Sequence, residues 1–130
     1  RILSWNEFNS CIELITDACK DTKYSGVYGF PRGGLCLAVA LSHSMNIPLI
    51  EELSPGCLVV DDVYETGRTL NRVQLVPNTT TFVWYSKVQP QWWKAVETSK
   101  SNEWIVFPWE NKARAEEDFK TYQLSRNKSQ

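Results

Sequence analysis

Two adjacent acids, Asp61 and Asp62, follow directly after the apolar run Cys57–Val60. After Val63 and Tyr64, the segment Glu65–Thr69 combines a third acid with two threonines, a glycine and an arginine. Such a loop offers backbone N–H groups and hydroxyls to a phosphate, and the carboxylates can accept hydrogen bonds from sugar hydroxyls or hold a cation. This pattern is typical of a cradle for a phosphorylated sugar.

A second loop with chemical potential is the stretch Phe30–Gly34, in which Pro31 and Arg32 precede two glycines. Glycines let the backbone approach a ligand closely, and an arginine side chain supplies positive charge to an anionic ligand. Taken alone, the stretch is just as typical of an ordinary glycine-rich helix start. It becomes a candidate anion-binding loop because the same chain also contains the candidate phosphate-binding loop at Glu65–Thr69.

The segments around these loops predict alternating strands and helices. Short runs rich in β-branched and aromatic residues predict strands at Tyr24–Phe30, Pro48–Leu53, Cys57–Val60, Thr80–Ser86 and Glu103–Phe107. Apolar periodicity and a capping box at Ser4–Glu7 predict helices from there to about Lys20, over Leu35–Met45, from about Thr66 to Leu75, and over Lys112–Leu124. This alternation indicates an α/β fold, whose ligands bind outside the carboxyl ends of the strands.

The composition fits one compact domain, because the 130 residues include 14 Lys+Arg, 15 Asp+Glu and 42% hydrophobic residues. Such a balance argues against a broad basic surface, so we expect no nucleic-acid partner. No apolar run reaches membrane-spanning length, so we expect no membrane partner. The 4 cysteines lack Cys-x-x-Cys spacing and are expected to be reduced thiols of a cytoplasmic protein.

The segment Cys57–Thr69 resembles the phosphoribosyl-pyrophosphate (PRPP) motif of the type I phosphoribosyltransferases. The resemblance implies that Asp61 and Asp62 bind the ribose hydroxyls and that Glu65 assists proton transfer at purine N7. It assigns the 5-phosphate to the loop of Glu65, Thr66, Gly67, Arg68 and Thr69. The stretch Phe30–Gly34 resembles the pyrophosphate loop of the same family, which implies that Arg32 and Gly33 bind the diphosphate and makes the Pro31–Arg32 bond a candidate cis peptide.

The C-terminal part resembles one branch of this family. Lys87 follows a predicted strand, and Trp104–Glu110 is similar to the base-binding segment of xanthine-guanine phosphoribosyltransferases. This similarity implies that Lys87 donates to a purine 6-oxo group, that Trp104 stacks on the ring, and that the Ile105 backbone contacts the base edge. A solvated lysine and a core tryptophan remain alternatives for the first two.

Two departures from the family bear on function. Active members insert a long mobile loop before the acidic strand, whereas only Ser54–Gly56 stands here, and such a loop excludes water from the reacting centre. Val106 stands where the xanthine-guanine enzymes carry an acid, which leaves recognition of a 2-amino group open.

The resemblance as a whole implies a single phosphoribosyltransferase-like domain over residues 1–130, with a parallel sheet flanked by helices, a small C-terminal base-binding hood and a shortened catalytic loop. The implied activity is that of a magnesium-dependent glycosyltransferase of purine salvage, which converts PRPP and a 6-oxopurine to a nucleoside monophosphate and pyrophosphate. Asp61 and Asp62, catalytic together with Glu65, would hold Mg²⁺ largely through the substrate. A homodimer or higher homo-oligomer is also implied.

Two alternatives to this transferase remain open. The chain could be a non-catalytic regulatory protein that binds PRPP or a nucleotide, which the missing loop favours. It could also be a nucleoside-phosphate hydrolase that uses the same cradle.

Overall fold

The structure, a computed structural model, describes residues 1–99, 104–111, 113, 120–121 and 124. Two compact units are formed, one by Arg1–Phe8 with Asn102–Gln130 and the other by Asn9–Ser101. The single domain over residues 1–130 stays a prediction. Most of the predicted helix 112–124 lies outside the described residues. None of the described helices combines the length and the apolar character that a membrane crossing requires.

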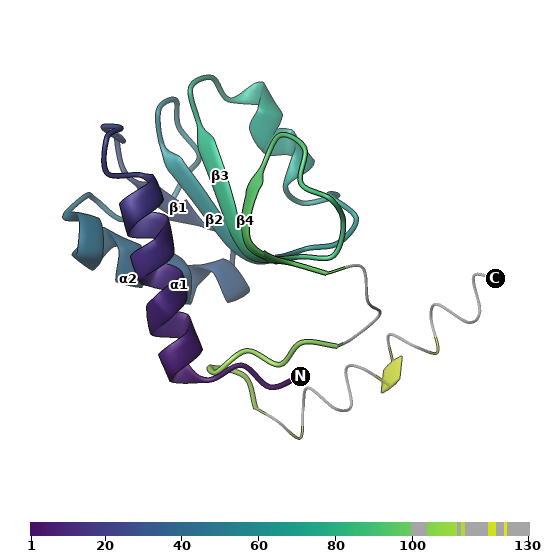
Figure 1. Ribbon diagram of the computed structural model, residues 1–130. Helices are drawn as coiled ribbons and strands as arrows, with labels where there is room; N and C mark the ends of the chain where they lie inside the picture. Colours follow the sequence, from purple (N-terminus) through teal and green to yellow (C-terminus); the bar gives the residue numbers. More distant parts are fainter. Residues whose placement is uncertain (100–103, 112, 114–119, 122–123, 125–130) are drawn as a thin grey trace. The chain divides into compact units, whose positions relative to one another are not determined.

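A parallel sheet of four strands, in the order β1-β2-β3-β4, forms the centre of the larger unit (Figure 1). The strands are β1 (Val27–Gly29), β2 (Leu58–Tyr64), β3 (Thr80–Ser86) and β4 (Lys94–Thr98). The register places Gly29 opposite Val60 and Asp61 opposite Val83. All carboxyl ends therefore lie along one edge, and the predicted parallel sheet is confirmed.

Helices cover both faces of this sheet, as the alternating pattern predicts. The helix α2 (Gly33–Met45) and the part of α1 (Trp5–Ala18) that belongs to this unit lie on one face, and the 3₁₀ helix η1 (Asn71–Leu75) lies on the other (Figure 1). Leu37, Ala38 and Leu41 are the buried side chains of α2. The other face holds a cluster that includes Phe30, Val59, Tyr64, Val73, Val83 and Trp93.

Glycines let α2 lie close against β1 and β2. A Cβ atom on Gly29 would lie 2.7 Å from the Ala38 Cβ, and one on Gly34 would lie 2.6 Å from the Val60 carbonyl oxygen. Side chains at these positions would force the helix away from the strands. The first turn of α2 is therefore held directly beside the carboxyl ends of both strands.

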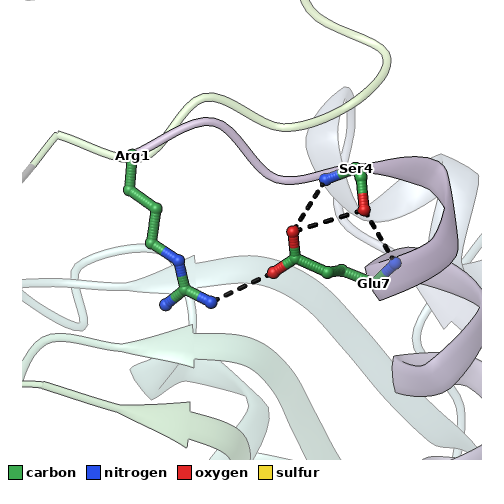
Figure 2. Close-up of polar contacts among 3 residues, drawn as sticks. All are labelled: Arg1, Ser4 and Glu7. Atoms are coloured by element: carbon green, nitrogen blue, oxygen red, sulfur yellow. Dashed lines mark hydrogen bonds and ion pairs between the residues drawn. The ribbon is translucent and has the colours of Figure 1, made fainter.

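The predicted capping box starts α1 (Figure 2). The Glu7 backbone N–H donates to Ser4 Oγ at 3.1 Å, and the Ser4 N–H donates to Glu7 Oε1 at 3.2 Å. Arg1 Nη2 donates to Glu7 Oε2 at 3.1 Å. The backbone hydrogen bond from Ser4 is the main reason why the pKa of Glu7 is lowered.

Four strand predictions need correction. The strand predicted over Tyr24–Phe30 is shortened to β1, Val27–Gly29. The strand predicted over Pro48–Leu53 is reduced to a parallel bridge between Leu49 and Val27, and the described part of the strand predicted over Glu103–Phe107 is reduced to a bridge between Val106 and Ile2. The strand predicted over Cys57–Val60 extends to Tyr64, because β3 continues to pair with the acidic residues and beyond. The sequence reasoning missed β4, whose polar residues are exposed or partly buried.

The helix predicted from about Thr66 is also wrong. Only η1 forms, and it begins at Asn71. Gly67 has a φ of 77°, which is outside the helical region, so the chain makes a loop before helical turns can start. Pro77 stands two residues after η1, which leaves no room for a longer helix.

Candidate functional site

A cavity of about 390 Å³ lies at the carboxyl ends of β1 and β2. Two loops line it, because the loops that follow neighbouring parallel strands emerge at the same edge of the sheet. One loop contributes Pro31, Arg32 and Gly33, and the other contributes residues 61–70. The structure thus brings together all the residues predicted to bind PRPP: Arg32, Gly33, Asp61, Asp62, Glu65, Thr66, Gly67, Arg68 and Thr69.

The charged forms of Asp61 and Asp62 are disfavoured in this cavity. Burial raises the pKa of Asp61 to about 8, and the neighbouring charge of Asp62 contributes to this rise. Burial also raises the pKa of Asp62, although the Val63 N–H donates to Asp62 Oδ1 at 2.8 Å. Neither carboxylate has an ion-pair partner among the described residues. The pair can therefore gain from a ligand that brings hydroxyl donors or a cation.

The donor chemistry of this pair fits a divalent cation that is held mainly by a ligand. Mg²⁺ commonly takes one or two protein carboxylates and fills its other positions with water and substrate phosphates. The described residues contain no cluster of three or more side chains that could hold a metal without a ligand. Asp61 and Asp62 are the carboxylates best placed for such a shared ion.

The first turn of α2 touches the acid pair. A Cβ atom on Gly33 would lie 2.8 Å from Asp62 Oδ1 and closer still to Oδ2, so only glycine fits beside this carboxylate. The peptide bond between Pro31 and Arg32 is cis, as the family resemblance predicts. The candidate diphosphate loop and the candidate ribose-binding acids therefore share one wall of the cavity.

Two arginines supply positive charge to the lining. Arg32 lies on the α2 side and Arg68 on the β2 side, and both are exposed. Neither forms an ion pair within the part of the chain that the structure describes. A guanidinium with its donors unused is suited to bind phosphate oxygens in a bidentate manner.

Lys87 forms an ion pair with Glu65. The Lys87 backbone N–H donates to the Tyr64 carbonyl oxygen at 2.9 Å, which continues the pairing of β2 and β3 past the end of β3. The exposed fractions of the two side chains are 14% for Lys87 and 28% for Glu65. The residue predicted to contact a base oxygen and the acid predicted to assist proton transfer thus lie together, a pairing that sequence reasoning did not predict.

The other two predicted base-binding residues belong to the smaller unit. The side chain of Ile105 is buried there, and that of Trp104 is partly buried. Both roles in base binding stay predictions.

Four lining residues were not predicted from the sequence: Pro31, Val63, Tyr64 and Leu70. Tyr64 and Leu70 are largely buried, and each also packs in the cluster on the η1 face of the sheet. The only available signal was their position within or next to the motif.

Comparison with known proteins gives no match to any family sequence model and no match to a curated protein sequence. Solved structures do match. The purine phosphoribosyltransferase from Pyrococcus horikoshii Ot3 is 27% identical with a TM-score of 0.71, over 85% of this chain and 93% of that chain. The xanthine-guanine-hypoxanthine phosphoribosyltransferase from Helicobacter pylori is 18% identical with a TM-score of 0.65, over 91% and 98%.

A third similar structure is a protein from Neisseria gonorrhoeae with bound ppGpp, which is 16% identical with a TM-score of 0.66, over 86% of this chain and 90% of that chain. Each of these three structures matches most of the present chain. Two of them are phosphoribosyltransferases. With its parallel sheet flanked by helices and its acidic motif at the end of β2, the chain has the fold of the type I phosphoribosyltransferases.

Proposed function

We propose that this chain is a phosphoribosyltransferase that transfers the phosphoribosyl group of PRPP to a purine base, and that the base is a 6-oxopurine. The observation that carries the proposal is the cavity in which Arg32, the acid pair and the loop Glu65–Thr69 converge. The similar structures from Pyrococcus and Helicobacter, which are named for purine substrates, support this choice.

The cavity offers a separate group to each part of PRPP. Asp61 and Asp62 accept hydrogen bonds from the ribose hydroxyls, and the loop Glu65–Thr69 receives the 5-phosphate together with the Arg68 guanidinium. Arg32 and the backbone of Gly33 receive the diphosphate. Asp61 and Asp62 would also hold Mg²⁺, which neutralises charge on the departing diphosphate when it is bound.

The reaction replaces one bond at C1 of the ribose with another. A purine nitrogen attacks C1, and the bond from C1 to the diphosphate oxygen breaks with its electron pair staying on the diphosphate. Arg32 stabilises the charge that develops there. Glu65 accepts the proton that the base loses, and Lys87 donates to the base oxygen, so the base takes the place of the direct contact between these side chains.

The test is a nucleotide-formation assay with PRPP, magnesium and one base at a time: hypoxanthine, guanine, xanthine, adenine or uracil. Nucleotide product with a 6-oxopurine is the expected result. Absence of product with every base, together with absence of PRPP binding in calorimetry, would overturn the proposal. Assembly as a homodimer or larger homo-oligomer and a place in cytoplasmic purine salvage are parts of the same proposal, and light scattering tests the assembly.

A second candidate is a regulatory protein that binds PRPP or a nucleotide without turnover. The connection before β2 favours it, because none of the residues 51–57 lines the cavity. The Gly56 N–H donates to the Pro77 carbonyl at 3.1 Å and the Ser25 N–H donates to the Gly56 carbonyl at 3.0 Å, which fixes this connection at the amino ends of the strands. The similar Neisseria protein was solved with ppGpp. Binding without product in the same assay would support this candidate.

A further inference from the structure

The side chains of Tyr64 and Asn71 close the two ends of the loop Glu65–Thr69, which we call the phosphate loop. The Tyr64 hydroxyl donates to Asn71 Oδ1 at 3.1 Å. The Asn71 backbone N–H donates to the Gly67 carbonyl at 2.8 Å. One residue before the loop and one shortly after it are thus joined to each other, and Asn71 is also joined to the middle of the loop.

The loop is folded tightly over this contact. Gly67 has a φ of 77°, and a Cβ atom on it would lie 2.7 Å from Asn71 Oδ1 and closer still to the Tyr64 hydroxyl. The Tyr64 hydroxyl and the Asn71 amide therefore lie directly against the Gly67 backbone. They limit the conformations of the residue whose backbone must turn sharply for its neighbours to face the cavity.

The ring of Tyr64 is fixed by packing against Trp93 in the core. The ring stacks on Trp93 with a centroid distance of 3.6 Å and an interplanar angle of 13°. The Trp93 indole N–H donates to Ser86 Oγ at 3.1 Å, so the residue under Tyr64 is anchored to the end of β3. Tyr64 is only 7% exposed. A ring with so little freedom presents its hydroxyl at a fixed place.

We propose that Tyr64 and Asn71 are positioning residues that hold the phosphate loop in its anion-binding form, with Trp93 as the support beneath Tyr64. The inference rests on the proposed function for the identity of the anion, a sugar phosphate. It goes beyond that function because the role assigned to both side chains is to hold the loop, although Tyr64 also lines the cavity. Preorganised backbone N–H groups bind an anion more tightly, since less ordering of the loop is required on binding.

The test compares Tyr64→Phe and Asn71→Leu with the control Tyr28→Phe. In the control, a partly buried tyrosine that packs against the cluster on the η1 face of the sheet loses its hydroxyl. The probes are ribose 5-phosphate and inorganic pyrophosphate, with affinities measured by calorimetry. We expect each loop variant to bind ribose 5-phosphate about threefold to tenfold more weakly, the range for one lost hydrogen bond. Pyrophosphate affinity should change by less than about twofold, because that ligand is assigned to the Arg32 loop.

Further outcomes separate this inference from the proposed function. The double variant should bind ribose 5-phosphate no more weakly than either single variant, because both substitutions remove the same contact. Unchanged ribose 5-phosphate affinity in Tyr64→Phe, or an equal loss for both ligands, would overturn the positioning role. If the unmodified chain binds neither probe and also binds no PRPP with magnesium, the proposed function fails, and amide hydrogen exchange still decides the role of the pair. Exchange at residues 66–69 should be faster in Tyr64→Phe than in Tyr28→Phe, and equal rates would overturn the inference.

Discussion

The ammonium group of Lys87 and the carboxylate of Glu65 form an ion pair at the ends of two adjacent strands. Backbone pairing brings them together, because Tyr64 lies opposite Ser86 and the Lys87 N–H donates to the Tyr64 carbonyl at 2.9 Å. Both side chains are largely withdrawn from water. Each charge therefore depends on the other more than the charges of an exposed pair would.

Removal of one partner should accordingly destabilise the fold. We expect Lys87→Met to lower the free energy of unfolding by about 1–2 kcal/mol, between the values for exposed and fully buried pairs, because Glu65 keeps a partly desolvated charge. Urea denaturation at neutral pH measures the change. In the double variant with Glu65→Gln, part of the loss should return. Strictly additive losses in this cycle would contradict a direct interaction between the two residues.

Asp61 should make the stability of the ligand-free protein depend on pH. Because its pKa is raised to about 8 in the folded state, the folded protein keeps a proton that the unfolded chain releases near pH 4. The contribution of Asp61 to the free energy of unfolding is therefore largest below the pKa of the unfolded chain, and it falls as the pH rises toward 8. We expect Asp61→Asn to raise the free energy of unfolding by about 1–3 kcal/mol at pH 8 and by less at pH 5.

Denaturation series at the two pH values measure this difference. The control is Asp21→Asn, which changes an exposed carboxylate. An equal gain in the free energy of unfolding for Asp61→Asn at pH 5 and pH 8 would show that the Asp61 carboxylate does not titrate in this range.

The same acids should be essential for PRPP. We expect the double variant Asp61→Asn with Asp62→Asn to lose measurable PRPP binding in calorimetry with magnesium, because amides cannot supply the negative charge that a shared cation requires. The fold should persist, as near-ultraviolet circular dichroism can check. Retained PRPP affinity in a folded double variant would refute the assignment of the acids to the ribose.

The two unpaired arginines should act on different parts of the ligand. We expect Arg32→Gln to weaken pyrophosphate binding about tenfold or more and to leave ribose 5-phosphate nearly unchanged, since one charge-assisted contact contributes about 1.5–3 kcal/mol. Arg68→Gln should show the opposite preference. Each variant serves as the control for the other in the same calorimetric titrations. Equal losses for both ligands in either variant would mean that the cavity is not divided in this way.

Much of the core fold could be predicted because its signals are local. The strand Thr80–Ser86 has the bounds that its β-branched and aromatic run predicts, and the capping box at Ser4 and Glu7 forms as expected. The two candidate loops also lie at one sheet edge, which follows from parallel pairing alone. These features depend on neighbouring residues or on one general rule of α/β folds.

Other features could not be predicted because they depend on pairing between distant residues. Nothing local in Lys94–Thr98 marks a strand, and this edge segment becomes β4 by pairing with β3. The ion pair of Lys87 with Glu65 needs the exact register of β2 and β3. The contact between Tyr64 and Asn71 needs the positive φ of Gly67, which a helical pattern in the sequence conceals.

The contact between β1 and β2 also sets a fixed span between the two proposed anion sites. Gly29 lies opposite Val60, and the Phe30 N–H donates to the Val60 carbonyl at 3.1 Å, just before the two loops diverge. Backbone pairing therefore determines how far the Arg32 loop lies from the phosphate loop. One molecule that carries two anions at the matching distance binds its second anion at a high effective concentration, whereas two separate anions gain nothing from each other. If both loops bind anions as proposed, the sheet register would select ligands by the spacing of their charges.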